Sequence, residues 1–106
     1  MPEMHFHVEW PNGHVARCYS PSYVVEEHLT VGEAYRVEDF VARTRAALET
    51  ASERVMARYG FACSSALDQL RAIEETAAAL APEEQRGLVK VLEFEKHAPR
   101  DARKSG

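Results

Sequence analysis

An alternating stretch near the start of the chain constrains the fold most. Apolar residues occupy every second position there, at Met4, Phe6, Val8 and Trp10. This is the period of a strand with one buried face. Residues 11–13 (PNG) then interrupt the pattern, and residues 14–20 (HVARCYS) suit a second strand. We therefore predict a β-hairpin whose first strand points its even-numbered residues toward a core.

Two turns could close this hairpin, and they give different registers. A two-residue type I′ turn at 12–13 would pair His7 with Cys18 and put both on one face, as a metal site requires. A three-residue loop would start with Pro11 and would pair Phe6 with Cys18 instead. Pro11 has a fixed φ that suits this position and no N–H to donate to the shorter turn. We therefore predict the three-residue loop, with Cys18 on the apolar face.

This register leaves His5 and His7 together on the polar face of the first strand. Two histidines at i and i+2 can bind one metal ion together, but the hairpin offers no third ligand. We therefore expect this face to be solvated or covered by a partner chain, and we expect no cofactor. Cys63 precedes an expected helix N-terminus, a position that can activate a thiol, although a small apolar turn residue is the simpler interpretation. No residue is predicted to be catalytic, and metal binding is left open. The candidate ligand-binding residues are His5, His7, Cys18 and Cys63.

The rest of the chain predicts one more strand and three helices. Residues 32–37 (GEAYRV) suit a third strand, and residues 38–59 carry an apolar stripe at helical spacing, with Gly60 placed to end the helix. A second helix follows over 62–80, with Ser64 or Ser65 as its N-cap. Pro82 opens a third helix over 82–98, which Gly87 weakens.

Together these elements predict an α+β fold in a single domain over residues 1–95. A small three-stranded antiparallel sheet, made of the hairpin and one further strand, packs against the long helix, and two more helices follow. Residues 96–106 are expected to form a basic flexible tail. A small sheet with open edges and a long apolar stripe also predicts a homodimer.

Charge and composition exclude several classes of protein. The net charge is −4, and residues 96–106 contribute +3, so the remainder carries −7, which argues against nucleic acid as a partner. No apolar run is long enough to span a membrane, and the first residues do not form a secretory signal. Two cysteines in such a chain indicate free thiols and a cytoplasmic location.

Several segments, in this order, resemble one small bacterial family of nitrogen-starvation response proteins. The segments are FHVEWPNGHVARCYSPS, VVEEHL, GEAYRVEDFVARTRAAL, ASERV and RYGFACSSALDQL. The resemblance covers about residues 1–81. It implies a gene cluster with a nitrilase and a radical SAM protein, and a role in assimilating nitrogen from nitriles or cyanide. It carries over no catalytic or binding residue.

The function expected from these observations is that of a non-enzymatic accessory or binding protein in nitrogen-starvation or nitrile-nitrogen assimilation. It would act through a small ligand or a partner protein, such as an enzyme of the same gene cluster. The alternative is a small metal- or thiol-dependent protein that uses the face of His5 and His7, or Cys63. This alternative needs at least three ligating side chains to converge.

Overall fold

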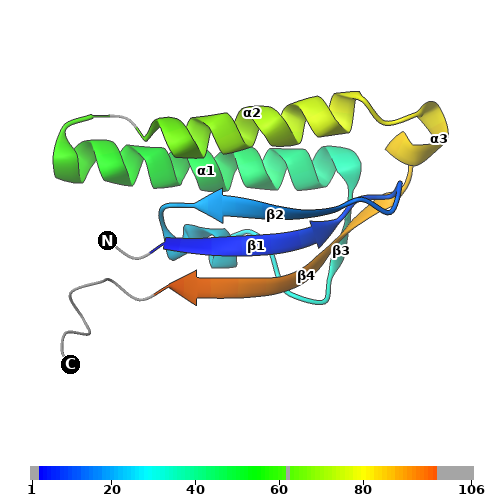
Figure 1. Cartoon of the computed structure of the whole chain (residues 1–106), viewed down its shortest axis with the longest axis horizontal. Helices are drawn as coiled ribbons and strands as arrows, with labels where there is room; N and C mark the ends of the chain where they lie inside the picture. The colour runs from blue at the N-terminus through cyan, green and yellow to red at the C-terminus, as the bar shows by residue number, and fades with distance from the viewer. Residues whose placement is uncertain (1–2, 62, 98–106) are drawn as a thin grey trace.

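The computed structural model describes residues 3–61 and 63–97 and has an α+β architecture with two layers (Figure 1). One layer is an antiparallel sheet of four strands in the order β2-β1-β4-β3. The other layer contains two long helices side by side. The strands are β1 (Glu3–Glu9), β2 (Val15–Ser20), β3 (Ala34–Arg36) and β4 (Leu88–His97), and the helices are η1 (Tyr23–Glu27, a 3-10 helix), α1 (Val37–Tyr59), α2 (Ser64–Ala78) and α3 (Pro82–Gln85).

The predicted hairpin and its register are confirmed. Phe6 lies opposite Cys18, as the three-residue loop requires. The N–H of Trp10 donates to the carbonyl of His14, and the N–H of Gly13 donates back to the carbonyl of Trp10, each at 2.8 Å. Gly13 has a φ of 88°, a left-handed conformation that glycine adopts without strain. The chemistry of Pro11 therefore identified the correct turn.

The predicted third helix is wrong beyond its first turn. The helix ends at Gln85, and the chain continues as β4, which lies between β1 and β3 in the sheet. The sheet therefore has four strands instead of the expected three. Gly87 marks the change of direction, because a Cβ at this position would lie 2.6 Å from the Cβ of Pro11 in the hairpin loop. The glycine thus allows the chain to pass the loop, rather than weakening a helix.

A β-bulge at Leu92 divides β4 into two halves. Val91 lies opposite Val8, but Glu93 lies opposite His7, so the register shifts by one residue between them. Strict alternation after Val91 would turn the side chain of Glu93 toward the helices. The extra residue reverses the phase, so that Phe94 packs against the core instead.

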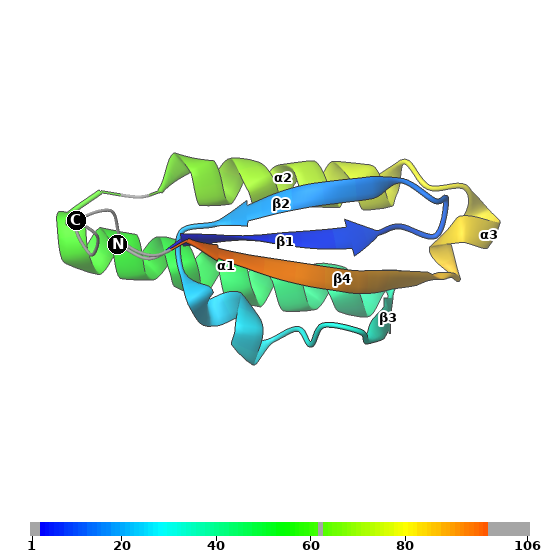
Figure 2. The same ribbon diagram turned by 60° about the horizontal axis from the view of Figure 1, so that its bottom comes forward.

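The prediction for α1 is confirmed over most of its length. Its buried residues are Val37, Phe40, Thr44, Ala47, Leu48, Ala51, Ser52 and Val55, and Gly60 ends it with a φ of 82°. Met56 and Tyr59, near the C-terminal end of α1, are about half exposed. The reason is that the last turns of α1 extend past the end of the sheet (Figure 2).

The helix α2 lies beside the edge strand β2 (Figure 2). Its Gln69 side chain accepts a hydrogen bond at 2.9 Å from the N–H of Tyr19, which satisfies a donor on the free edge of β2. Neither predicted serine is its N-cap: Cys63 occupies that position, without a side-chain hydrogen bond. In its first turn, Leu67 is exposed and Ala66 is buried.

The predicted boundary between the domain and its C-terminal tail is two residues too early. Lys96 and His97, which were assigned to the tail, belong to β4. The remaining tail residues, 98–106, lie outside the described residues. Within the described part of the chain, no helix combines the length and apolar character needed to cross a membrane.

Candidate functional site

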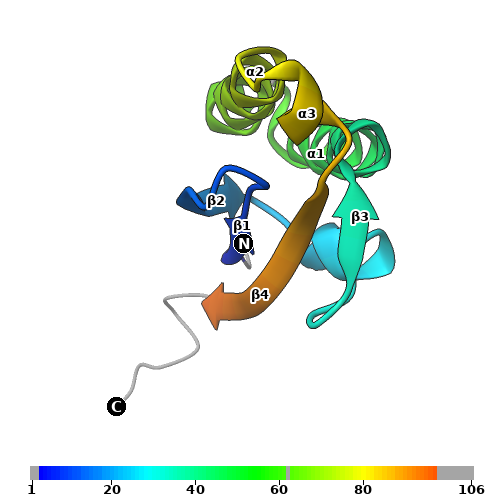
Figure 3. The ribbon, with the colours of Figure 1, turned by 90° about the vertical axis from the view of Figure 1, so that its right-hand side faces the viewer.

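One face of the sheet is covered by α1 and α2, whereas no helix of the described residues lies over the other face (Figure 3). This open face collects the ionisable side chains of three adjacent strands. His7 of β1 lies between Arg17 of β2 and Glu93 of β4, and His5 lies between Tyr19 and Glu95. In the hairpin alone this face has two histidines, and β4 adds Glu93 and Glu95 beside them.

Three of these side chains form a compact cluster. The Nε2 atom of His7 lies 2.6 Å from Oε1 of Glu95 and 3.7 Å from Oε2 of Glu93. One potential ligand atom from each residue lies within 4.8 Å of the other two. The His7 side chain is 23% exposed, Glu95 is 35% exposed and Glu93 is 61% exposed, so the cluster is accessible from solvent. An imidazole and two carboxylates are a donor set that metal ions accept.

Arg17 fixes one side of this cluster. Its Nε–H donates to Oε1 of Glu95 at 2.9 Å, and the same oxygen accepts from His7. These hydrogen bonds, from Arg17 first and His7 second, lower the pKa of Glu95 to about 2. Glu95 is therefore a carboxylate at every physiological pH.

His5 forms a second pair beside this cluster. Its Nδ1 lies 2.9 Å from Nε2 of His97, and the two rings meet edge to face. Because one nitrogen must accept the proton that the other donates, at least one ring is neutral. Partial burial, followed by the nearby charges of Arg17 and His97, lowers the pKa of His5.

Cys18 lies away from both histidines. It is on the covered face of the sheet, where it is 1% exposed, and burial raises the pKa of its thiol to about 12. A thiol with this pKa stays protonated and unreactive at neutral pH. It forms no disulfide with Cys63.

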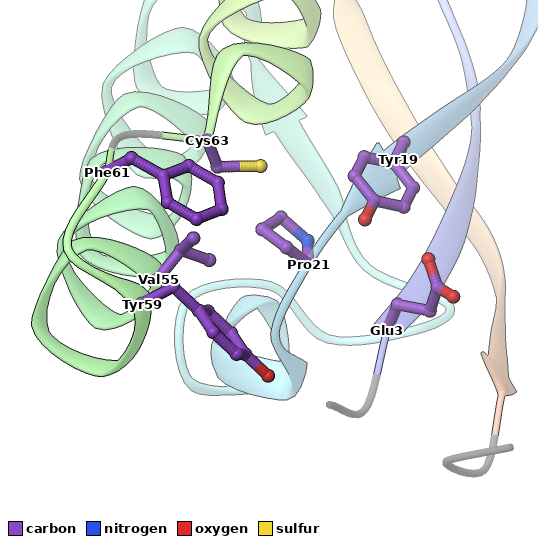
Figure 4. A pocket seen from close by; sticks show the side chains of 7 residues that line it. All are labelled: Glu3, Tyr19, Pro21, Val55, Tyr59, Phe61 and Cys63. Atoms are coloured by element: carbon purple, nitrogen blue, oxygen red, sulfur yellow. The ribbon is translucent and has the colours of Figure 1, made fainter.

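Cys63 lines a separate cavity of about 290 Å³ at one end of the molecule (Figure 4). The wall comes from α1, from the segment between α1 and α2, and from the ends of β1 and β2. The lining residues are Glu3, Tyr19, Pro21, Val55, Tyr59, Phe61 and Cys63. Burial, followed by the carboxylate of Glu3, raises the pKa of Tyr19 to about 12, so its hydroxyl remains protonated.

The four candidate residues thus separate into three places. His5 and His7 share the open face, Cys18 is in the core, and Cys63 is at the cavity. Sequence reasoning missed Glu93, Glu95 and His97, because it placed them on a helix. A signal was available: β-branched Val89 and Val91 flank the polar Lys90 soon after a glycine, which favours a strand.

The fold defines a small α+β protein with a polar sheet face that is accessible to solvent. A family model described as nitrogen starvation-induced protein NitG matches residues 5–94. The chain therefore belongs to this family, and the resemblance to nitrogen-starvation proteins is confirmed. Neither a curated protein nor a solved structure matches the chain. The gene-cluster context stays a prediction.

Proposed function

We propose that the protein is a non-enzymatic accessory protein of nitrogen assimilation during starvation that binds a small ligand in the cavity beside Cys63. The observation that carries this proposal is the cavity itself, in which apolar walls meet a few polar groups at one end. This combination is typical of small-molecule sites, and a volume of about 290 Å³ suits a small ligand.

The lining indicates the chemistry of the ligand. Pro21, Val55 and Phe61 offer apolar contact, while Tyr19 adds an aromatic ring with a protonated hydroxyl. Glu3 is the only carboxylate among the lining residues, and no arginine or lysine accompanies it. A carboxylate with aromatic neighbours favours a small ligand that carries an amine, and it disfavours an anion.

The lining also supports a binding role more than a thiol-dependent reaction. Cys63 has no imidazole beside it among the lining residues, so a nucleophile and its base are not paired there. The thiol-dependent alternative predicts such a pair.

Cys63 offers a direct test of ligand binding. Because Cys18 is buried and its thiol is protonated, a thiol reagent such as DTNB should label native protein at Cys63 first. We expect benzylamine to slow this labelling at constant pH, and benzoate of similar size to have little effect. In a Cys18→Ser variant Cys63 is the remaining cysteine, so all labelling can be assigned to it.

Matched variants identify the group that selects the ligand. Glu3→Gln removes the carboxylate from the cavity, and we expect it to abolish the difference between benzylamine and benzoate. Glu9→Gln lies on the same strand but outside this cavity, so protection should persist. Equal protection by both compounds, or none by either at millimolar concentration, would contradict the proposed ligand chemistry.

We further propose that the protein is a cytoplasmic homodimer that works with an enzyme of its pathway. Exposed apolar side chains near the α1–α2 connection support contact with another protein surface: Met56, Tyr59, Phe61 and Leu67. Sedimentation equilibrium should give twice the mass of the chain. A Phe61→Asp variant should shift the equilibrium toward monomer, while Leu88→Asp, at an exposed apolar position on β4, should not.

A further inference from the structure

The cluster on the open sheet face has more negative charge than an ordinary ion pair requires. Glu93 and Glu95 both face His7, and Arg17 contacts only Glu95. Among the described residues, no side chain donates a hydrogen bond to the Glu93 carboxylate. Its contact with Nε2 of His7, at 3.7 Å, is too long for one. Two carboxylates held near one neutral or singly charged imidazole leave room for a cation.

The bulge at Leu92 creates this arrangement. If β4 continued past Val91 by strict alternation through Leu92, Glu93 and Glu95 would point into the core. Bulges frequently occur where a strand must redirect side chains next to a functional site. The backbone therefore carries an irregularity that places two carboxylates on the open face: Glu93 opposite His7, and Glu95 opposite His5 and within reach of His7.

From this geometry we infer that His7, Glu93 and Glu95 bind a divalent transition-metal ion such as Zn²⁺. The site is independent of the cavity beside Cys63 and of the function proposed for it. An imidazole nitrogen with two carboxylate oxygens suits zinc, whereas magnesium and calcium prefer oxygen ligands alone.

The distances are compatible with metal coordination after a small adjustment. Zinc binds nitrogen and oxygen ligands at about 2.0–2.2 Å, so adjacent ligand atoms of a tetrahedral site lie about 3.4 Å apart. The separation between His7 and Glu93 is 3.7 Å, close to this value. His7 and Glu95, now at 2.6 Å, must move apart as the metal replaces the proton that they share.

Arg17 acts as a positioning residue for this site. Its hydrogen bond to Oε1 of Glu95 joins β2 to β4 across the intervening strand β1, and so restrains the Glu95 side chain. Outer hydrogen bonds of this kind orient ligating carboxylates. Three protein ligands leave at least one coordination position open to water or to a further ligand.

The test is isothermal titration of ZnCl₂ into the full, metal-free chain, with CoCl₂ absorption as a readout of the coordination shell. We expect one ion per chain. His7→Gln, Glu93→Gln and Glu95→Gln should each weaken binding by about tenfold or more, since even changes to groups behind the ligands cost this much. Circular dichroism and thermal melting establish that each variant is folded.

Two controls locate the site. Glu9→Gln changes a carboxylate on the same face of β1, opposite Lys90, and should leave zinc affinity unchanged. His97→Gln tests whether the neighbouring His5–His97 pair binds the ion instead, and it should also have little effect. Glu93→Gln is the most informative variant, because this side chain is exposed and contributes least to the fold.

The inference is overturned if ZnCl₂ does not bind at concentrations up to about 100 times a micromolar Kd. It is equally overturned if zinc binds but Glu93→Gln and Glu95→Gln retain full affinity, or if His97→Gln or a Cys63→Ser variant removes binding. None of these outcomes bears on benzylamine protection of Cys63, so the two proposals succeed or fail separately.

Discussion

The two faces of the sheet differ completely, although the same two central strands supply both. On the covered face, Phe6 and Val8 of β1 and Val91 of β4 have no exposed surface. On the open face, His7 and Glu93 of the same strands remain accessible. The covered face therefore provides stability, while the open face is free to carry groups for binding. Substitutions should separate the two roles.

Phe6→Ala should give the largest effect. Phe6 is fully buried at the centre of the covered face, and removal of a buried phenylalanine ring costs about 3–5 kcal/mol of unfolding free energy. Urea denaturation measures the loss. His5→Ala, at the preceding position on the open face, should cost much less, and similar losses would refute the division between the faces.

Two groups on the open face, Glu95 and His5, should make the unfolding free energy fall in acid. The folded pKa of Glu95 lies at about 2, below its ordinary value of 4.5, so the stability it contributes is present above pH 4.5 and is lost as the pH falls toward 2. The pKa of His5 is also lowered, so protonation below pH 6.5 destabilises the folded state as well.

Urea denaturation between pH 7 and pH 3 checks this account. The unfolding free energy of the wild type should fall below pH 6.5, where His5 is involved, and again below pH 4.5, where Glu95 is involved. Glu95→Gln should lose less between pH 4.5 and pH 3, because the substituted residue does not titrate. Identical profiles for the two proteins would show that the contacts of Arg17 and His7 do not hold the carboxylate in its ionised form.

Glu93→Gln should have the smallest effect on stability in the absence of metal. Its side chain is 61% exposed, and surface substitutions of this kind change the unfolding free energy by about 0.5 kcal/mol or less. Thermal melting without added metal provides the measurement. A large loss would show that the open face also carries the stability of the sheet.

The sequence predicted local features well and missed a long-range one. Pro11 determined the hairpin register, and the apolar stripe with Gly60 identified α1, because these signals act over a few residues. The segment of β4 was misread because the bulge interrupts its alternation at Leu92, so Leu88, Val91 and Leu92 imitate helical spacing. Its partners in β1 and β3 lie at least 52 residues earlier in the chain, and no local pattern reveals them.

The same error hid most of the candidate site. The sequence placed His5 and His7 together on the polar face of a strand, where the hairpin alone offers them no third candidate ligand. Glu93 and Glu95, the further candidates, become neighbours of His7 only when β4 enters the sheet beside β1. A site built from two distant strands needs the topology as well as the residues.

The central claim is that β4 pairs with β1 through a bulge at Leu92, which places Glu93 opposite His7. Nuclear magnetic resonance of labelled protein tests it directly, through backbone chemical shifts and cross-strand NOEs. The account predicts extended-strand shifts over Leu88–His97 and NOEs that pair Val8 with Val91 and His7 with Glu93. Helical shifts over this segment, or NOEs that pair His7 with Leu92, would contradict it.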